Sequence, residues 1–384
     1  MVNAVYDHIF AIIIVGIIFV SAVVALPAMS LINIRAVDQQ QLRNIALNVF
    51  NALLLDTGEP ANWGSFLDFQ MNDPRIKRFG LASAEDPAFY VLDPDKVQRL
   101  VVGNPLNYVD YNRVRELLGL QGYGFKLRII PPFNVTNVDG TPIREKSPII
   151  IQSKQLNYSI KVSYLDGTPI PNAQVHAIII YTEGSNFGIT SRPPVSTNAL
   201  GICSDTATLN FVPKHVVVVL RVTVADVATI TVTFGDTPPD DIAKINFVGD
   251  EIILTMPDAT PRGARWIDNI IPITSDDDIE FLYNGTRGNE DKLNYGAFKV
   301  WSKSFNGLKK RNPVVFIFNF WAVIEGEGRQ EVLIAGPYHN LLGHTIFEYG
   351  STPEDSSSAV KIRRSVIIAG MTYIAELWLW KESS

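Results

Sequence analysis

The densest group of candidate oxygen ligands in the sequence is Asp276, Asp277 and Asp278. A hard cation such as Ca²⁺ binds several oxygen atoms at once, and three consecutive carboxylates can supply some of them. A run of like charges is also typical of a solvated turn, and the sequence leaves both interpretations open. These residues are therefore a weak calcium candidate, and no other metal site is predicted.

None of the common catalytic motifs is present. The sequence has no G-x-x-x-x-G-K-[ST], no G-x-G-x-x-G, no H-E-x-x-H, no G-x-S-x-G and no C-x-x-C. One Cys and five His leave little material for a metal centre. We therefore expect a protein that is not an enzyme and that needs no cofactor.

The overall composition excludes two further classes of protein. The 384 residues include 39 acidic and 33 basic side chains, for a formal net charge of -6. This balance excludes a nucleic-acid-binding protein that relies on a basic surface, so we predict no nucleic-acid partner. Hydrophobic residues make up 47% of the chain, which excludes bulk disorder.

The amino-terminal part contains the longest apolar segment. Residues 9–34 carry no charged side chain over 26 positions. A helix of that length would rise about 39 Å, more than the roughly 30 Å hydrocarbon core of a bilayer. We predict a transmembrane helix, or one that later packs into an assembly. A buried core helix and a cleaved secretory signal are the alternatives.

An amphipathic helix is predicted to continue this segment. Apolar residues recur at three- and four-residue steps, at Leu42, Ile45, Ala46, Val49 and Leu53. Gly58 and Pro60 predict the end of the helix, and Pro27 predicts a kink near its middle.

The charges beside residues 9–34 and the Asn-x-Ser/Thr sequences give opposite indications of the side of the membrane on which the body lies. Arg35 and Arg43 follow the segment, which by the positive-inside rule would place the body in the cytoplasm. Three Asn-x-Ser/Thr sequences favour the outside, and their candidate glycosylation acceptors are Asn134, Asn157 and Asn284. We expect a membrane-anchored, extracellular protein, located at the cell surface or in a filament.

From Lys126 onward the hydrophobic period changes to two, and short β-branched runs alternate with turn residues. The sequence DGTPI occurs at 139–143 and again at 166–170, and each Asp-Gly predicts a tight turn. We expect an α+β, mostly β fold. The predicted domains are a transmembrane and amphipathic helix (1–58), a small α+β head (59–155), a β-sandwich (156–236) and a C-terminal β-rich domain (237–384).

The two-part helix and several later segments resemble the type IV pilin superfamily, especially pilin-like and pseudopilin-like surface proteins of archaea. The similar segments are ALNVFNALLLDTGEPANWGS (46–65), FGLAS (79–83), YVLDPDKVQRL (90–100) and KLRIIPPFNVTN (126–137). The resemblance implies that Asp7 pairs with the amino terminus of a neighbouring subunit. Residues 159–180 are similar to surface-exposed immunoglobulin-like modules, so the 156–236 sandwich is expected to be of that type.

The sequence therefore predicts a structural subunit of a pilus-like filament, which displays β domains outside and has copies of itself as partners. The apolar helix would bundle with other copies, with Ile14 and Val15 in the contact. Gly16, Ser21 and Ala22 would permit close helix approach. The alternative is a membrane-anchored binding or adhesion protein that does not polymerise.

Overall fold

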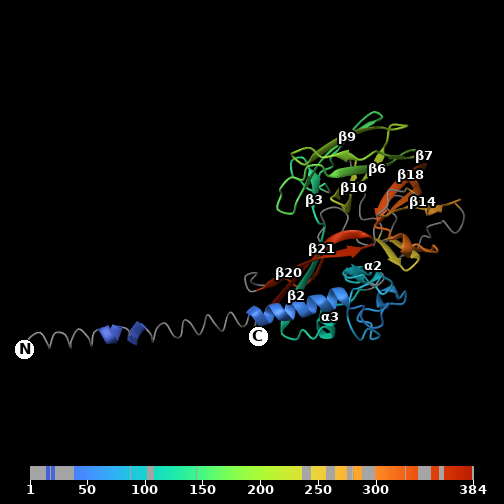
Figure 1. Ribbon diagram of the computed structural model, residues 1–384. Helices are drawn as coiled ribbons and strands as arrows, with labels where there is room; N and C mark the ends of the chain where they lie inside the picture. The colour runs from blue at the N-terminus through green and yellow to red at the C-terminus, as the bar shows by residue number, and fades with distance from the viewer. Residues whose placement is uncertain are drawn as a thin grey trace, which may run out of the picture.

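The structure of the chain is a computed structural model (Figure 1). It describes residues 14–17, 19–21, 39–86, 88–101, 108–143, 145–235, 244–256, 264–274, 279, 281–287, 299–324, 326–335, 347–353 and 359–382. These residues are mostly in β-strands, which form five sheets.

The predicted transmembrane helix is wrong. In the part of the chain that the structure describes, residues 14–17, 19–21 and 39–55 are α-helical near the amino terminus, and no helix is long and apolar enough to cross a membrane. The fold class is corrected to mostly β, with no such helix among the described residues, and the membrane-anchored location that depended on it is corrected as well. The charge-free run of residues 9–34 was the basis of the prediction, and absence of charge measures hydropathy alone.

The first sheet combines strands from both ends of the described chain, in the order β1-β20-β21-β2-β19. Their bounds are β1 Val91–Leu92, β2 Tyr123–Ile130, β19 Phe347–Gly350, β20 Val360–Ile368 and β21 Met371–Lys381. The β2 and β21 strands are antiparallel, with Tyr123 opposite Lys381 and Ile130 opposite Ile374. This pairing joins two segments that lie far apart in the sequence.

The helix of residues 39–55 packs against one face of this sheet (Figure 1). Its buried side chains form one stripe, consisting of Ala46, Val49, Phe50, Leu53 and Leu54. Opposite them lie alternate residues of the paired strands, including Leu127 and Leu377, which are also buried. The three- and four-residue steps in the sequence match this stripe.

Three short helices complete this part of the molecule: η1 Trp63–Ser65, α2 Pro94–Gln98 and α3 Tyr111–Leu117. The Asp93 side chain caps α2 by accepting a hydrogen bond from the Asp95 amide, and Asp110 caps α3 through the Asn112 amide. Aspartate is a favoured cap because its carboxylate satisfies a free amide in the first helical turn.

Two further sheets enclose a second core. One has the order β3-β5-β4, with β9 also paired to β5, and the other has the order β11-β10-β6-β7, with β8 paired to β6. Their bounds are β3 Asn134–Asn137, β4 Ile149–Gln152, β5 Gln155–Ser163, β6 Gln174–Glu183, β7 Asn186–Ser191, β8 Val195–Ser196, β9 Ile202–Thr208, β10 His215–Val224 and β11 Val227–Phe234. This paired-sheet arrangement agrees with the predicted sandwich, and its immunoglobulin-like type stays a prediction.

Both DGTPI sequences form turns of the same kind. The Asp139 carboxylate accepts a hydrogen bond from the Thr141 amide, and Asp166 does the same for Thr168. Gly140 and Gly167 have φ of 87° and 88°, a conformation that favours glycine. The repeat is therefore a pair of equivalent turns.

The β6 strand is apolar on both faces because its sheet is covered on both sides. Ile179 belongs to the core between the two sheets of the sandwich. Its neighbours Ile178 and Ile180 belong to the core that also contains the helix of residues 39–55. A strand covered on both faces has no need to alternate apolar with polar residues.

The remaining two sheets have the orders β12-β13-β16 and β15-β14-β17-β18. Their bounds are β12 Lys244–Val248, β13 Glu251–Met256, β14 Ala264–Ile273, β15 Tyr283–Asn284, β16 Lys299–Ser304, β17 Val315–Ile324 and β18 Glu327–Ala335, with η3 Lys309–Arg311 between β16 and β17. Aromatic side chains fill the core between these sheets, among them Phe247, Phe316 and Phe318.

Replacing Phe50 tests the packing of the helix on the first sheet. Phe50 is 1% exposed, so we expect Phe50→Ala to lower the free energy of unfolding by about 3–5 kcal/mol through lost burial and a residual cavity. Phe89→Ala is the matched control, because Phe89 is 82% exposed and its loss should change stability by less than about 0.5 kcal/mol. Urea unfolding measures both, and equal effects would contradict the packing.

Candidate functional site

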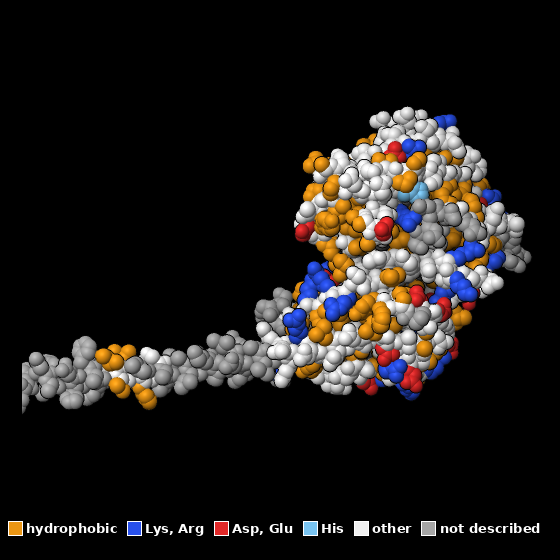
Figure 2. All heavy atoms as spheres, viewed as in Figure 1, with side chains coloured by type: hydrophobic (Ala, Val, Ile, Leu, Met, Phe, Trp, Pro, Cys, Tyr) orange, Lys and Arg blue, Asp and Glu red, His pale blue; other side chains and the backbone are white. Residues whose placement is uncertain are grey.

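Apolar side chains of the helical residues 14–17 and 19–21 are exposed (Figure 2). The exposed fractions are 46% for Ile14, 65% for Val15, 60% for Ile17, 68% for Phe19 and 62% for Val20. At about 100° per residue, these positions spread around the whole circumference of the helix. We call this set the apolar segment. It contrasts with the helix of residues 39–55, whose apolar stripe is buried in the same chain.

Small residues lie within the apolar segment. A Cβ atom added at Gly16 would meet no atom within 4 Å. The Ser21 hydroxyl donates a 2.7 Å hydrogen bond to the Ile17 carbonyl, so its polar group is satisfied within the helix. Of the assembly residues predicted from the sequence, the structure thus describes Ile14, Val15, Gly16 and Ser21. Asp7, Ala22 and Pro27 lie outside the described residues.

The three candidate glycosylation acceptors lie on strands. The Asn134 amide on β3 donates to the Tyr164 carbonyl at 3.4 Å. Asn157 on β5 accepts a 2.6 Å hydrogen bond from the Thr206 hydroxyl, and Asn284 on β15 accepts one of 3.0 Å from the Asn269 amide. Glycosylation at these positions stays a prediction.

The calcium candidate Asp276, Asp277 and Asp278 lies outside the described residues. Within the described ranges, no group of three or more His, Cys, Asp or Glu side chains is placed to hold a metal ion.

Charged side chains alternate in sign across the outer face of the first sheet. In strand order, Arg363 on β20 is opposite Glu376 on β21, Glu376 is opposite Arg128 on β2, and Arg128 is opposite Glu348 on β19. The Arg128 Nη1 atom lies 3.1 Å from Glu376 Oε2, and its Nε atom lies 3.1 Å from Glu348 Oε1. Arg363 contacts Glu376 from the other side.

The neighbouring row on the same face adds two lysines and a tryptophan. Lys361 on β20 is opposite Trp378 on β21, which is opposite Lys126 on β2. The Lys361 Nζ atom lies 3.0 Å from Glu376 Oε1 and 4.7 Å from the centre of the Trp378 ring. The Lys126 Nζ atom lies 2.7 Å from Glu348 Oε2. We call the six charged residues of the two rows the charged ladder: Lys126, Arg128, Glu348, Lys361, Arg363 and Glu376.

Glu376 is the centre of the charged ladder, and its side chain is fully buried by the cations around it. Burial raises the pKa of Glu376, but the Lys361 hydrogen bond and the charges of Lys361, Arg363 and Arg128 outweigh that effect and lower the pKa below its ordinary value. Two carboxylates thus face four cations, which leaves two positive charges in excess. Figure 2 shows Lys and Arg side chains gathered over this part of the molecule.

The charged ladder was hard to predict from sequence, because its residues come from four strands, β2, β19, β20 and β21. Arg363 and Arg364 form only a two-residue basic run, and Lys126 and Arg128 are separated by a leucine. A period-two strand places residues i and i+2 on one face. The basic residues at 126/128 and at 361/363 were therefore the pattern that could have indicated a basic sheet face. The register that aligns them comes from strand pairing.

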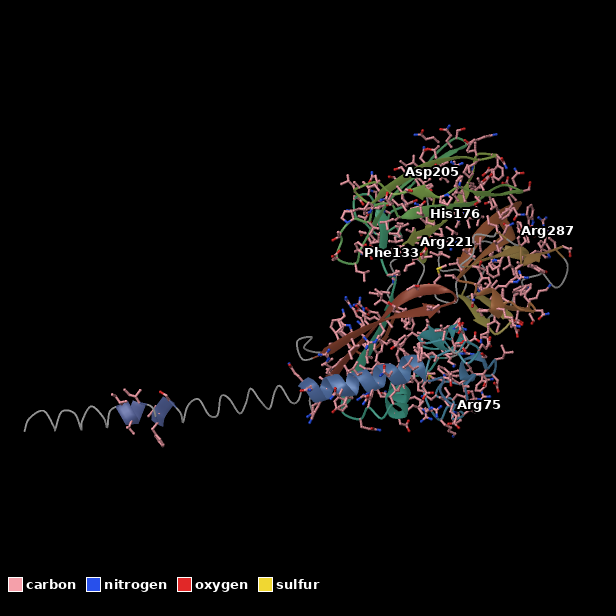
Figure 3. The ribbon with its side chains drawn as sticks, viewed as in Figure 1. Arg75, Phe133, His176, Asp205, Arg221 and Arg287 are labelled. Carbon is pink, nitrogen blue, oxygen red and sulfur yellow. The ribbon has the colours of Figure 1, made fainter. Side chains whose placement is uncertain are left out.

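Other ion pairs lie in separate parts of the molecule. Asp205, Arg287 and Arg75 lie in three separate parts of the molecule (Figure 3). Arg287 pairs with Asp268 at 2.9 Å, and Arg75 lies 2.6 Å from Asp73, where its hydrogen bond lowers the pKa of that carboxyl to about 2. Arg75 also pairs with Asp68 at 3.1 Å, so neither of these two groups has the excess of positive charge that the charged ladder has.

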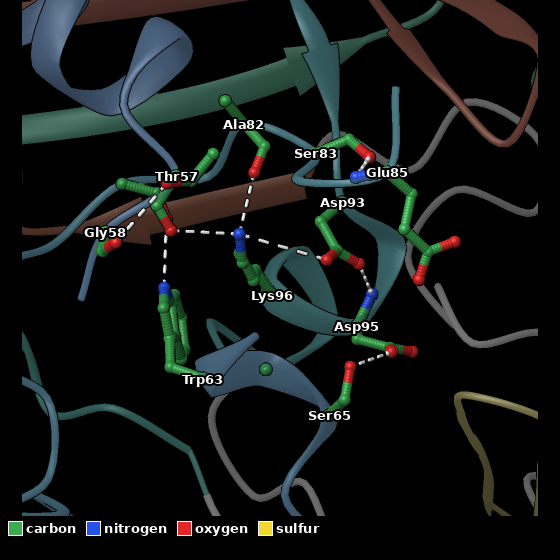
Figure 4. A network of polar contacts seen from close by, with 12 residues as sticks. Thr57, Gly58, Trp63, Ser65, Ala82, Ser83, Glu85, Asp93, Asp95 and Lys96 are labelled. Carbon is green, nitrogen blue, oxygen red and sulfur yellow. Dashed lines mark hydrogen bonds and ion pairs between the residues drawn. The ribbon is translucent and has the colours of Figure 1, made fainter. Parts of the chain in front are cut away.

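A buried group of carboxylates and amines lies around α2, with Asp93, Asp95 and Lys96 close together (Figure 4). It joins α2 to the turn between β12 and β13. Asp95 is fully buried and accepts hydrogen bonds from Ser65 Oγ at 2.5 Å, from the Gly249 amide at 3.2 Å and from Lys309 Nζ at 3.3 Å. Lys309 Nζ also lies 3.6 Å from Asp93 Oδ1 and 3.1 Å from Glu85 Oε1.

A second amine of this buried group lies on α2 itself. The fully buried Lys96 donates to the Ala82 carbonyl at 2.7 Å and to the Thr57 carbonyl at 2.9 Å. These bonds attach α2 to the segment that follows the helix of residues 39–55.

Burial and charge shift the pKa values of this group in opposite directions. Burial, and then the neighbouring Asp95 carboxylate, raise the pKa of Asp93, while burial lowers the pKa of Lys96. Burial also acts to lower the pKa of Lys309, but the carboxylates of Asp95 and Asp93 raise it above its ordinary value. Lys309 is therefore the charged partner that stabilises the two aspartates. The group fixes α2 in place.

A cleft of about 450 Å³ opens beside the end of the helix of residues 39–55. Its apolar lining includes Leu54, Leu55 and Phe89, and its rim includes the exposed Asp86. Phe89 and Leu55 are also among the exposed large hydrophobic residues. The segment that supplies this rim, Ser83–Tyr90, also contains the exposed Glu85.

No protein-family model matches this chain, and no curated protein matches it. Among solved structures, the crystal structure of a mutant Salmonella alpha-2-macroglobulin matches with 12% sequence identity and a TM-score of 0.20. The match covers 64% of this chain and 22% of that chain, so this protein spans about a fifth of the length of the macroglobulin. A likeness this weak carries no conclusion about fold or function. The resemblance to type IV pilins stays a prediction.

Removing the Lys309 amine tests the buried group. We expect Lys309→Met to lower the free energy of unfolding by about 3–5 kcal/mol, because Asp93 and Asp95 would keep their buried carboxylates without their main cation. Lys310→Met is the matched control, since the Lys310 side chain is exposed. Chemical denaturation measures the difference, and equal stability of the two variants would contradict the role of Lys309.

Proposed function

We propose that the protein is a structural subunit that assembles with copies of itself into a filament through the apolar segment. The observation that carries this proposal is the exposure of five large apolar side chains around one short stretch of helix. Each would contribute on the order of 1–2 kcal/mol when buried against a neighbouring subunit. Exposure of these side chains to water is unfavourable, and contact with other copies would bury them.

The distribution of these side chains favours several neighbours over one. One partner is enough to bury a helix with a single apolar face, as the sheet buries the apolar stripe of the helix of residues 39–55. The apolar segment has no polar face among its described residues, so one partner would leave part of it exposed. A repeated contact that joins unlike surfaces and does not close into a ring produces an open helical polymer.

Small residues support close contact between the segments. The open space at Gly16 and the internally bonded hydroxyl of Ser21 allow a neighbouring helix to approach without burying an unsatisfied polar group. The β-rich body would remain on the outside of such a bundle.

Aspartate substitutions in the apolar segment test this function. We expect Ile14→Asp and Val15→Asp to abolish filaments, because a buried carboxylate without a partner costs more than the lost apolar contact. Thermal unfolding should stay unchanged, since both side chains are exposed within the chain. Ultracentrifugation with negative-stain electron microscopy measures assembly.

The matched control is Ile150→Asp, because Ile150 on β4 is 60% exposed and lies in a different part of the molecule. This variant should form filaments at the wild-type yield. Filaments of normal yield from either Ile14→Asp or Val15→Asp would overturn the proposal. A binding or adhesion protein that does not polymerise would then be the better account of the exposed body surfaces.

A further inference from the structure

Among the residues that the structure describes, the cations of the charged ladder pair only with its own two carboxylates. Its cations Lys126, Arg128, Lys361 and Arg363 exceed its carboxylates by two. Arg363 and Glu348 are about half exposed, so the face is accessible to solvent. Such a face attracts an acidic partner over distances of about a Debye length.

A second copy of this chain has the complementary charge. The ladder carries two excess positive charges, so a chain of net charge -6 has a net charge of -8 outside it. Exposed Glu85 and Asp86 are adjacent in sequence, and Asp86 lines the cleft together with Phe89, which is 82% exposed. An exposed aromatic side chain with charged neighbours is the composition of a protein contact.

We propose that the charged ladder of one copy binds the Ser83–Tyr90 segment of the next copy. Asp86 faces the ladder cations and Phe89 packs beside Trp378, while Glu85, which pairs with Lys309 of its own chain at 3.1 Å, lies next to the contact. This contact rests on the proposed function, because it supplies the body-to-body contact of the same filament.

The two surfaces are different, which has a geometric consequence. Each copy presents one ladder and one Ser83–Tyr90 segment, so a pair joined by a single contact still has one free surface of each kind. A heterologous contact of this kind that does not close into a ring extends into an open helical polymer. The apolar segment supplies the burial energy, while the charged contact sets the register and the rate of association.

Charge reversal with a compensating swap tests this contact in the full-length chain. We expect Asp86→Lys to raise the critical concentration for assembly about tenfold at low salt, since it places a cation against the ladder. Arg363→Glu should have a similar effect, and the double variant Asp86→Lys/Arg363→Glu should return close to the wild-type value. Glu183→Lys and Lys154→Glu are matched controls, because both positions are exposed and belong to the sandwich. Light scattering against protein concentration measures all five variants.

Salt provides a second measurement. Between about 0.01 M and about 1 M NaCl the Debye length falls from about 30 Å to about 3 Å, so the difference between Asp86→Lys and wild type should disappear. Because Asp86 lies on an exposed loop, this variant is informative even if Arg363→Glu unfolds through its contact with Glu376.

The possible failures are distinguishable. If Ile14→Asp abolishes assembly while Asp86→Lys assembles as wild type at low salt, the charged contact is overturned and the proposed function stands. If the single reversals weaken assembly but the double variant does not recover while folded, the pairing of these two surfaces is overturned. If Ile14→Asp assembles normally, the proposed function is overturned, and the charged contact loses the filament on which it rests.

Discussion

The antiparallel pairing of β2 with β21 is the interaction on which the rest of the structure depends. It connects Tyr123–Ile130 with Met371–Lys381, and thereby holds the two sandwich sheets and the aromatic core as one long insertion between paired strands. Closing so long a loop carries an entropic cost, which grows only slowly with loop length. The buried side chains on one face of this pair and the ion pairs on the other face offset that cost.

The two faces of this sheet have different roles, one in packing and one in carrying charge. One face buries the apolar stripe of the helix of residues 39–55, which fixes this helix on the sheet. The other face carries the charged ladder, with the buried Glu376 holding three cations in place. The group around Asp95 and Lys309 joins α2 to the turn between β12 and β13, and so orients the Ser83–Tyr90 segment. The surfaces proposed to meet in a filament are thus fixed relative to one frame.

Local patterns in the sequence predicted local structure well, while long-range pairing stayed beyond them. The apolar steps at Ile45 and Val49 indicated the packed helix, and each DGTPI indicated its turn, because both depend on neighbouring residues. The ladder depends on the register between strands of distant segments, which no single window of sequence contains. The transmembrane helix was predicted from the lack of charge in residues 9–34. That lack of charge measures hydropathy and leaves helix length undetermined, and no helix in the described ranges is long and apolar enough to cross a membrane.

The most direct test of the account is the assembly of the purified, full-length wild-type chain as its concentration is raised. Light scattering with negative-stain electron microscopy should show a threshold concentration, above which filaments of constant diameter form and below which the chain is monomeric. The exposed apolar segment predicts this behaviour, because other copies can cover it on all sides. A chain that remains monomeric at every concentration, at both low and high salt, would contradict the account.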